Sequence, residues 1–267
     1  MSAFTDLTDY LAFVKGPQEI GHTVKNTSGS VVAGRMASHW MVPAPTATAP
    51  TTAVACTSAT TGAIGQANTG STSNFIVAGN MNHRQGGLHI LADRLSHQGG
   101  LSGTSAVAQT TNLPTAALTR YTTGAGVMMG LEIYTDIGNT AVLVSASYTN
   151  QAGTSGRTAP SVVWGGSGFN TAFRLALLPL AAGDSGVRAV ASVTATASTG
   201  TVGNFGVTLF KPLLAIPTYP GVVNFDAINN MLGGMPEITS DACLQWLYVP
   251  MVTSTVGTHS SLSFAWR

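Results

Sequence analysis

Residues 127–149 read VMMGLEIYTDIGNTAVLVSASYT, and this stretch carries the clearest secondary-structure pattern of the chain. Two runs rich in apolar residues, 127–135 and 141–149, flank the segment DIGNT at 136–140. Along the second run, Val142, Val144, Ala146 and Tyr148 alternate with Leu143, Ser145 and Ser147. Strict alternation is typical of a strand that is covered on one face. Since Gly and Asn are typical of tight turns, the stretch predicts a β-hairpin.

Further strand-like runs follow this predicted hairpin. They occupy 174–178, 187–198 and 205–210, and Gly-rich segments separate them. Within 187–198 we expect one face to carry Val190, Ser192, Thr194 and Thr196, and the other to carry Ala189, Ala191, Val193 and Ala195. Strands of this length with short connections predict an all-β domain over 86–217, an antiparallel β-sandwich or a jelly-roll-like fold.

Short helical and extended segments are expected on both sides of this domain, in 1–85 and 218–267. Residues 3–14 have apolar side chains at helical spacing, which predicts an amphipathic helix. The uncharged segment 42–74 opens with several prolines and predicts an extended arm, which we interpret as a strap laid over a partner. In the C-terminal extension, which we expect to pack on the β domain or on a neighbour, 223–231 predicts a short helix and 261–267 a final strand.

The chain carries very little charge. Asp, Glu, Lys and Arg make up 8% of its residues, against about 25% in an ordinary soluble domain. Surface charge keeps a free protein soluble and monomeric, so the composition predicts a homo-oligomer or a subunit covered by other proteins. The formal net charge is +1 and no basic stripe is visible, so we expect no nucleic-acid partner. The absence of a long apolar run and of a targeting pattern predicts no membrane contact and folding in a cytoplasm.

One group of residues has the composition of a metal site: His83, His89, Asp93 and His97. On a helix over 88–96, the spacing of His89, Asp93 and His97 would align three ligands. The alternative is a hydrogen-bonded helix or turn in which Asp93 pairs with Arg94 or another arginine. No HExxH pattern accompanies the group. We therefore predict no metal site.

Catalytic motifs are equally weak. Glu132 and Asp136 would form a carboxylate pair for glycoside hydrolysis, but such residues are typically solvated turn carboxylates. The G-x-S-x-G nucleophile elbow is missing, and no lysine follows a glycine, so no Walker A motif can be written. The sequence predicts a protein that is not an enzyme, with no catalytic or cofactor-binding residues and no cofactor.

The remaining polar and aromatic residues favour structural roles. We expect each of five arginines to pair with a carboxylate or to donate to backbone carbonyls. These are Arg94, Arg120, Arg157, Arg174 and Arg188, with Asp93, Asp136 and Asp184 as the natural partners. Cys56 and Cys243 are expected to be buried thiols, with a disulfide as the alternative. Core packing is likewise the expectation for Trp40, Trp164, Trp246 and Tyr148, and stacking platforms for a glycan are the alternative.

Three segments resemble virion structural proteins of tailed bacteriophages. They are LADRLSHQGGLSGT at 91–104, SYTNQAGTSGRT at 147–158 and LPLAAGDSGVR at 178–188. The resemblance covers roughly 88–217 and carries no catalytic signature. It implies a component of a viral particle without placing it on that particle.

The leading hypothesis is a non-enzymatic structural component of a tailed-phage particle, a capsid decoration or cement protein that stabilises neighbouring capsid subunits. Its partners would be copies of itself and major capsid or neck proteins, and its location the virion, assembled in the host cytoplasm. A head–tail neck or collar component is an alternative in the same class. A receptor- or carbohydrate-binding module and a β-fold hydrolase that uses Glu132 and Asp136 are alternatives from other classes.

Overall fold

The computed structural model of this chain consists of strands and turns. It describes residues 20–40, 49–64, 74–83, 85–114, 117–166, 168–220, 224–226 and 237–266. These residues contain no helix, and therefore none that is long and apolar enough to cross a membrane. The paired strands run antiparallel, so the predicted antiparallel all-β class is confirmed.

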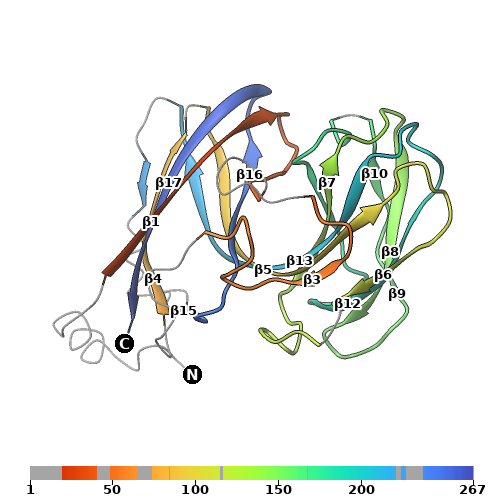
Figure 1. Cartoon of the computed structure of the whole chain (residues 1–267), viewed down its shortest axis with the longest axis horizontal. Coiled ribbons are helices and arrows are strands. Elements are labelled where there is room, and N and C mark those ends of the chain that lie inside the picture. The colour runs from red at the N-terminus through yellow and green to blue at the C-terminus, as the bar shows by residue number, and fades with distance from the viewer. Residues whose placement is uncertain are drawn as a thin grey trace.

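The strands form three sheets, with a central sheet between two outer ones (Figure 1). The central sheet has the order β11 (Leu175–Leu178), β7 (Met128–Thr135), β13 (Asn204–Thr218), β5 (Gly87–Leu101), β16 (Leu244–Pro250) and β2 (Ala37–Ser38), and β3 (Ala53–Ala55) also pairs with β5. The first outer sheet, here called the sandwich sheet, has the order β10 (Val162–Trp164), β8 (Val142–Asn150), β12 (Val187–Ala195) and β6 (Gln109–Leu113), with β9 (Arg157–Thr158) paired to β8. The second, here called the terminal sheet, has the order β1 (Ile20–Val31), β17 (Ser254–Trp266), β4 (Asn74–His83) and β14 (Asn224–Asp226), with β15 (Glu237–Ile238) paired to β4.

Two strands of 15 residues, β5 and β13, extend through both halves of the molecule. At one end of the pair, Leu95 and Val207 belong to the largest apolar core, which the sandwich sheet covers through residues such as Val144 and Trp164. Toward the other end, Leu91 and Ile216 belong to a second core, which also contains Ile76 and Met81 of β4 in the terminal sheet. The central sheet is thus shared by two packed layers.

The hairpin predicted at 127–149 is wrong, although its two strands exist. β7 pairs with β11 and β13 in the central sheet, whereas β8 pairs with β9, β10 and β12 in the sandwich sheet. Segment 136–140 crosses between the sheets, and other loops hold its backbone. Ile137 N donates to Asn170 O (2.9 Å) and Thr140 N to Thr199 O (3.0 Å). Each of the two strands therefore pairs with neighbours in its own sheet, and they do not pair with each other across the turn.

The helix predicted at 88–96 is also wrong, because this segment lies inside β5. Almost every residue from 91 to 97 is buried, since packed layers cover both faces of the central sheet. A strand buried on both faces loses its two-residue alternation, and its polar residues then mimic helical spacing. The Gly99–Gly100 pair does not stop a helix. It lets another backbone approach, because a Cβ on Gly99 would lie 2.0 Å from Pro50 O.

That neighbouring backbone belongs to the predicted arm. β3 pairs with β5 over Ala53–Ala55, and Cys56 N donates to Leu95 O (2.9 Å). The described part of the arm, 49–64, therefore lies along this chain's own central sheet, and the interpretation of that part as a strap over a partner is wrong. Residues 42–48 and 65–73 lie outside the described residues, as does the helix predicted at 3–14.

Four smaller expectations have mixed outcomes. On β8 the predicted faces are confirmed, because Val142, Val144, Ala146 and Tyr148 are buried. On β12 the predicted faces are wrong, since register shifts at Arg188 and Ala191 bring Val187, Val190, Val193 and Ala195 into the core. Within the helix predicted at 223–231, Asn224–Asp226 is the strand β14, and the other residues lie outside the described part. The predicted final strand is confirmed, and as β17 it begins earlier, at Ser254.

Candidate functional site

The candidate metal ligands do not converge. His89, Asp93 and His97 lie four residues apart along β5, and four residues of strand span about 13 Å. Each has its own surroundings: the His89 ring stacks on Tyr248 at 4.4 Å, and Asp93 binds Arg120. The side chain of His83 is outside the described part. Among the described residues, no group of three or more His, Cys, Asp or Glu could hold a metal ion.

The candidate catalytic carboxylates are separated as well. Glu132 is buried in the central sheet, where its Oε2 accepts hydrogen bonds from Thr208 (2.6 Å) and Tyr134 (3.0 Å). Asp136 is exposed beyond the end of β7, and its Oδ1 accepts from Ala172 N (2.7 Å). These two groups face different surroundings and offer no shared space to a glycosidic bond.

Glu132 instead pairs with Arg94, a guanidinium that is fully buried. Nη2 of Arg94 lies 2.7 Å from Oε2 of Glu132, and Nη1 donates to Oε1 of Gln245 (3.0 Å). Nε donates to Nδ1 of His97 (3.0 Å), and the guanidinium carbon lies 4.4 Å from the ring centroid of Trp40. A charge without water is tolerated only when it is paired and hydrogen-bonded, and this cluster meets both conditions.

The charges of this cluster shift its pKa values. Burial would raise the pKa of Glu132, but the Arg94 charge and several hydrogen bonds bring it below its ordinary value. Burial, and then the Arg94 charge, lower the pKa of His97 to about 3. His97 is therefore neutral at ordinary pH, and its Nδ1 is free to accept from Arg94.

A second buried pair joins distant segments of the chain. Arg120 makes a two-pronged contact with Asp93, with Nε to Oδ2 at 2.8 Å and Nη2 to Oδ1 at 2.9 Å. Nη2 also donates to Cys56 O in the arm (2.9 Å), and Nη1 lies 3.2 Å from Oδ2 of Asp241 in the C-terminal segment. Cys243 N donates to Oδ1 of Asp93 (2.9 Å). Arg120 thus ties the arm, β5 and the segment before β16 together.

The expected partnerships of the arginines are confirmed in kind but not in detail. Arg120 with Asp93 and Arg157 with Asp184 come from the expected set. The neighbour pair of Asp93 with Arg94 does not form, because successive residues of a strand point to opposite faces. The sequence reasoning missed Glu132 as the partner of Arg94. The one feature of the sequence that pointed to a buried role for Glu132 is its position inside the mostly apolar run 127–135.

Among the described residues, no carboxylate lies within ion-pair distance of the last two arginines of that set. Arg188 Nε donates to Thr123 O (3.1 Å). Arg174 Nη1 donates to Ser30 O (2.8 Å). Both arginines therefore donate to backbone carbonyls, and neither forms an ion pair with Asp136, the third carboxylate of the expected set.

Cysteine and the large aromatic residues are structural, as expected. Cys56 and Cys243 are buried free thiols in one cluster with Trp40 and Ala63. A hydrogen bond from Cys243 lowers the pKa of Cys56, and burial raises that of Cys243. Trp40, Trp164, Trp246 and Tyr148 are almost completely buried, so none of them offers a ring to a glycan.

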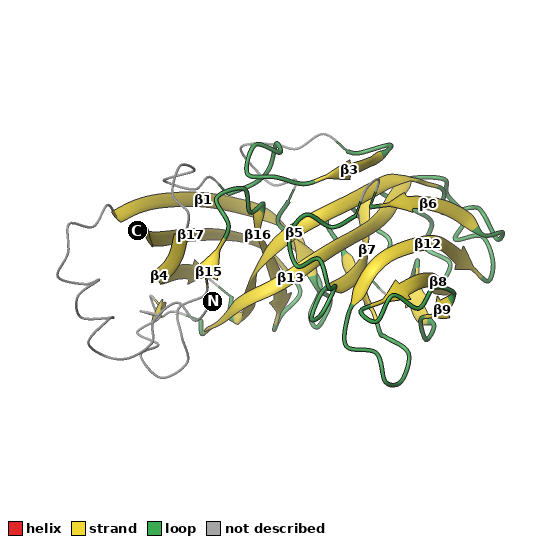
Figure 2. Cartoon of the chain, turned by 90° about the horizontal axis from the view of Figure 1, so that it is seen from below, coloured by secondary structure: helices red, strands yellow, loops and turns green. Residues whose placement is uncertain are grey.

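The outward face of the sandwich sheet carries rows of uncharged side chains. One row across four strands consists of hydroxyl residues in register: Thr110, Ser192, Ser147 and Thr158. Ser145 and Thr194 form the next pair, and the exposed apolar pair Leu143 and Val163 lies beyond them. Figure 2 shows β6, β12, β8 and β9 as successive strands at the surface, on the side away from β1 and β17. We call this surface the hydroxyl face.

The hydroxyl face contrasts with the placement of charge elsewhere. Among the residues whose burial is described, Asp93, Arg94, Arg120, Glu132 and Arg174 are buried. In the same part of the chain, Asp136 and Glu237 are exposed. The half-buried charged residues there are Arg35, Arg157, Asp184, Arg188, Lys211 and Asp241. The five buried charges therefore do not solvate the surface, and none of the residues named for the hydroxyl face carries a charge.

Comparisons with known proteins do not assign this chain to a family. No protein-family model matches the chain, and no curated protein matches its sequence. Among solved structures, the VP2 subviral particle of infectious bursal disease virus is 10% identical, with 94% of this chain and 81% of that chain covered, at a TM-score of 0.21. VP2-derived T=1 particles of the same virus are also 10% identical, with 93% and 78% covered, at a TM-score of 0.21. A TM-score this low does not establish a common fold, so the likeness carries no weight in assigning a function.

Proposed function

We propose that this protein is a non-enzymatic structural component of a tailed-phage particle, a decoration or cement protein that stabilises neighbouring capsid subunits. The observation that carries the proposal is the placement of charge: the ion pairs of Arg94 with Glu132 and of Arg120 with Asp93 are buried, while the hydroxyl face is polar but uncharged. The resemblance of 91–104, 147–158 and 178–188 to virion proteins of tailed phages supports the same role.

Such a surface suits permanent contact with another protein. Covering a charged surface removes ions from water at a high cost, whereas Ser and Thr hydroxyls can exchange water for a partner's hydrogen-bonding groups at little cost. Leu143 and Val163 add exposed apolar area at one end of the face. Depletion of charge is also what distinguishes the core of a protein interface from the rest of a surface.

The first test is the composition of purified particles. Quantitative mass spectrometry of gradient-purified virions should find this chain in stoichiometric amounts relative to the major capsid protein. A copy number in the hundreds supports a decoration protein, whereas about a dozen copies support a neck or collar component. Trace amounts would contradict both.

The second test is aimed at the hydroxyl face. The double variant Ser145→Lys/Ser147→Lys places two charges on that face, and Thr154→Lys/Ser185→Lys places two charges on exposed loops as a matched control. We expect the first variant to fold but to bind capsids lacking the protein at least tenfold more weakly, and the control to bind as the wild type does. Equal binding of both variants would remove the hydroxyl face from the proposal.

A further inference from the structure

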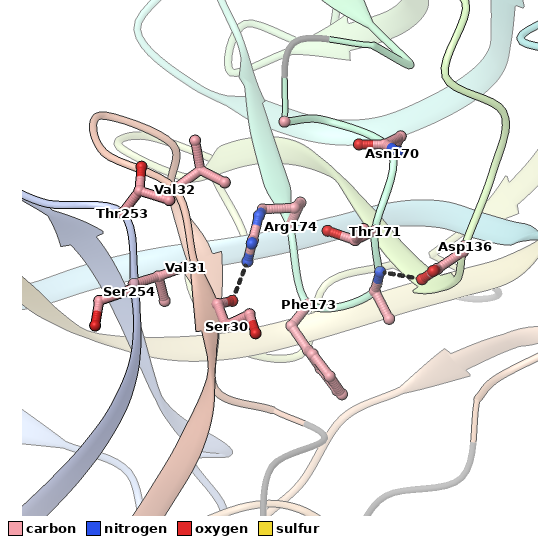
Figure 3. Close-up of a pocket in the computed structure, with 12 residues that line it drawn as sticks. Ser30, Val31, Val32, Asp136, Asn170, Thr171, Phe173, Arg174, Thr253 and Ser254 are labelled. Carbon is pink, nitrogen blue, oxygen red and sulfur yellow. Dashed lines mark hydrogen bonds between the residues drawn. The ribbon is translucent and has the colours of Figure 1, made fainter.

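A pocket lies where the end of the terminal sheet meets the loops of the sandwich. It has a volume of about 590 Å³, within the range of small-molecule sites. Val31 and Ser254, which are register partners on β1 and β17, form one side, and segment 170–174 forms the other. Figure 3 shows Arg174 extending from that segment to the carbonyl of Ser30.

Arg174 differs from the other buried arginines of the described chain. The residue is 2% exposed, yet none of the described carboxylates lies within ion-pair distance of it. One guanidinium nitrogen, Nη1, donates to Ser30 O (2.8 Å), and Nε is buried without a hydrogen-bond partner. Arg94 and Arg120, buried to a similar degree, each bind a carboxylate. A buried cation without a counter-ion is costly, so its presence at a pocket wall indicates a place for an anion.

The charges around the pocket restrict the kind of anion. Arg174 and Asp136 are the charged residues that line it, and Asp136 weakly favours the charged form of Arg174 from a longer distance. Asp136 repels a dianion such as phosphate more strongly than a monoanion, so the pair of one cation and one anion favours a monoanion as the ligand. The planar guanidinium fork matches the two oxygens of a carboxylate. Asn170, Thr171 and Thr253 supply neutral polar groups to the same wall.

We propose that this pocket binds a carboxylate through Arg174. Two sources share this chemistry: a free small carboxylic acid, and an Asp or Glu side chain of a second copy of this chain. The proposal is independent of the particle role, because it concerns a binding event that purified protein shows alone.

The test uses the purified full chain and sodium acetate as the probe, with sodium chloride exchanged for acetate at constant ionic strength. Acetate at ten times its Kd should raise the Tm of the wild type by about 3 °C. Arg174→Met should abolish the shift. The control Arg188→Met, which removes a half-exposed arginine far from the pocket, should keep it. Equal shifts in the wild type and in Arg174→Met, or no shift beyond that in chloride, would overturn the proposal.

Stability gives a second readout for the same variant. Arg174→Met removes a charge that has no carboxylate partner, so the variant should be at least as stable as the wild type in chloride. A large loss of stability, like that expected when the cation of a buried ion pair such as Arg94 is removed, would identify Arg174 as a structural residue and count against the site. If the variant does not fold, saturation-transfer NMR of the acetate methyl group on wild-type protein still decides whether acetate binds.

Sedimentation velocity distinguishes the two sources. If the occupant is an acidic side chain of a second copy, the wild type should associate, and both acetate and Arg174→Met should dissociate it. If the occupant is a free acid, acetate should raise Tm without any change in sedimentation. Both results support a carboxylate site, and absence of acetate binding refutes it whichever way the chain sediments.

Discussion

The two buried regions of the central sheet are filled by different chemistry. Under the sandwich sheet the core is apolar, with residues such as Leu131, Val144 and Trp164. On β5 and β7 the buried layer holds the pair of Arg94 with Glu132, while Arg120 joins Asp93 nearby. An apolar core loses stability in proportion to the atoms removed, whereas a buried ionic cluster fails when one member is missing. In this chain the few buried ion pairs therefore fix which segments meet, whereas apolar burial supplies most of the stability.

Removing one member of the buried pair should have the largest effect. Arg94→Met leaves Glu132 buried without a cation, and we expect a loss of about 4 kcal/mol in the free energy of unfolding. The double variant Arg94→Met/Glu132→Leu should recover much of this loss, because both charges are gone. Urea denaturation of the single and double variants measures the coupling, and strictly additive losses would contradict the contrast between the two regions.

A truncation in the apolar core provides the other side of the comparison. Leu131→Ala should cost about 3 kcal/mol through lost burial and the cavity that remains. Unlike the ionic pair, this site has no single partner whose removal restores stability. If Leu131→Ala combined with Val144→Ala recovered stability in the same denaturation experiment, the distinction would not hold.

The pH dependence of the ionic region should come next in size. The pKa of His97 is about 3 in the folded chain, against an ordinary value of 6.5, so the unfolded chain binds the proton first. Stability from this group is complete above pH 6.5 and falls as the pH drops toward 3. Between pH 7 and pH 5 the loss should be about 2 kcal/mol. His97→Gln should flatten the curve over that interval in thermal or urea denaturation, and an unchanged slope would show that His97 is charged or exposed.

The smallest effect on stability belongs to the hydroxyl face. Ser145→Lys/Ser147→Lys should change the free energy of unfolding by no more than about 1 kcal/mol, because surface substitutions rarely exceed 0.5 kcal/mol each. The same variant is expected to lose capsid binding. Denaturation of the isolated chain separates these two effects, and a large loss of stability would mean that the face packs within the chain itself.

Local patterns predicted the strands better than their partners. The alternation on β8 was sufficient because one face is covered and the other is not. On β5 the alternation disappears under two packed layers, and the spacing of His89, Asp93 and His97 imitates a helix. For the buried ionic residues too, local sequence patterns predicted less than the tertiary structure decided. The sequence indicated that the arginines need partners, but the tertiary arrangement decided that Arg94 meets Glu132 and that Arg174 meets Ser30 O.

By itself, the sequence determined an antiparallel all-β chain with scarce charge, because strand alternation, turn residues and composition are local properties. The tertiary structure alone decided that β7 and β8 belong to different sheets and that β5 is shared by two layers. It also decided that Arg94, Glu132, Arg120 and Asp93 are buried, while the hydroxyl face lies outside. The physical reason is that pairing and burial depend on segments far apart in the chain, whose contacts no local pattern contains.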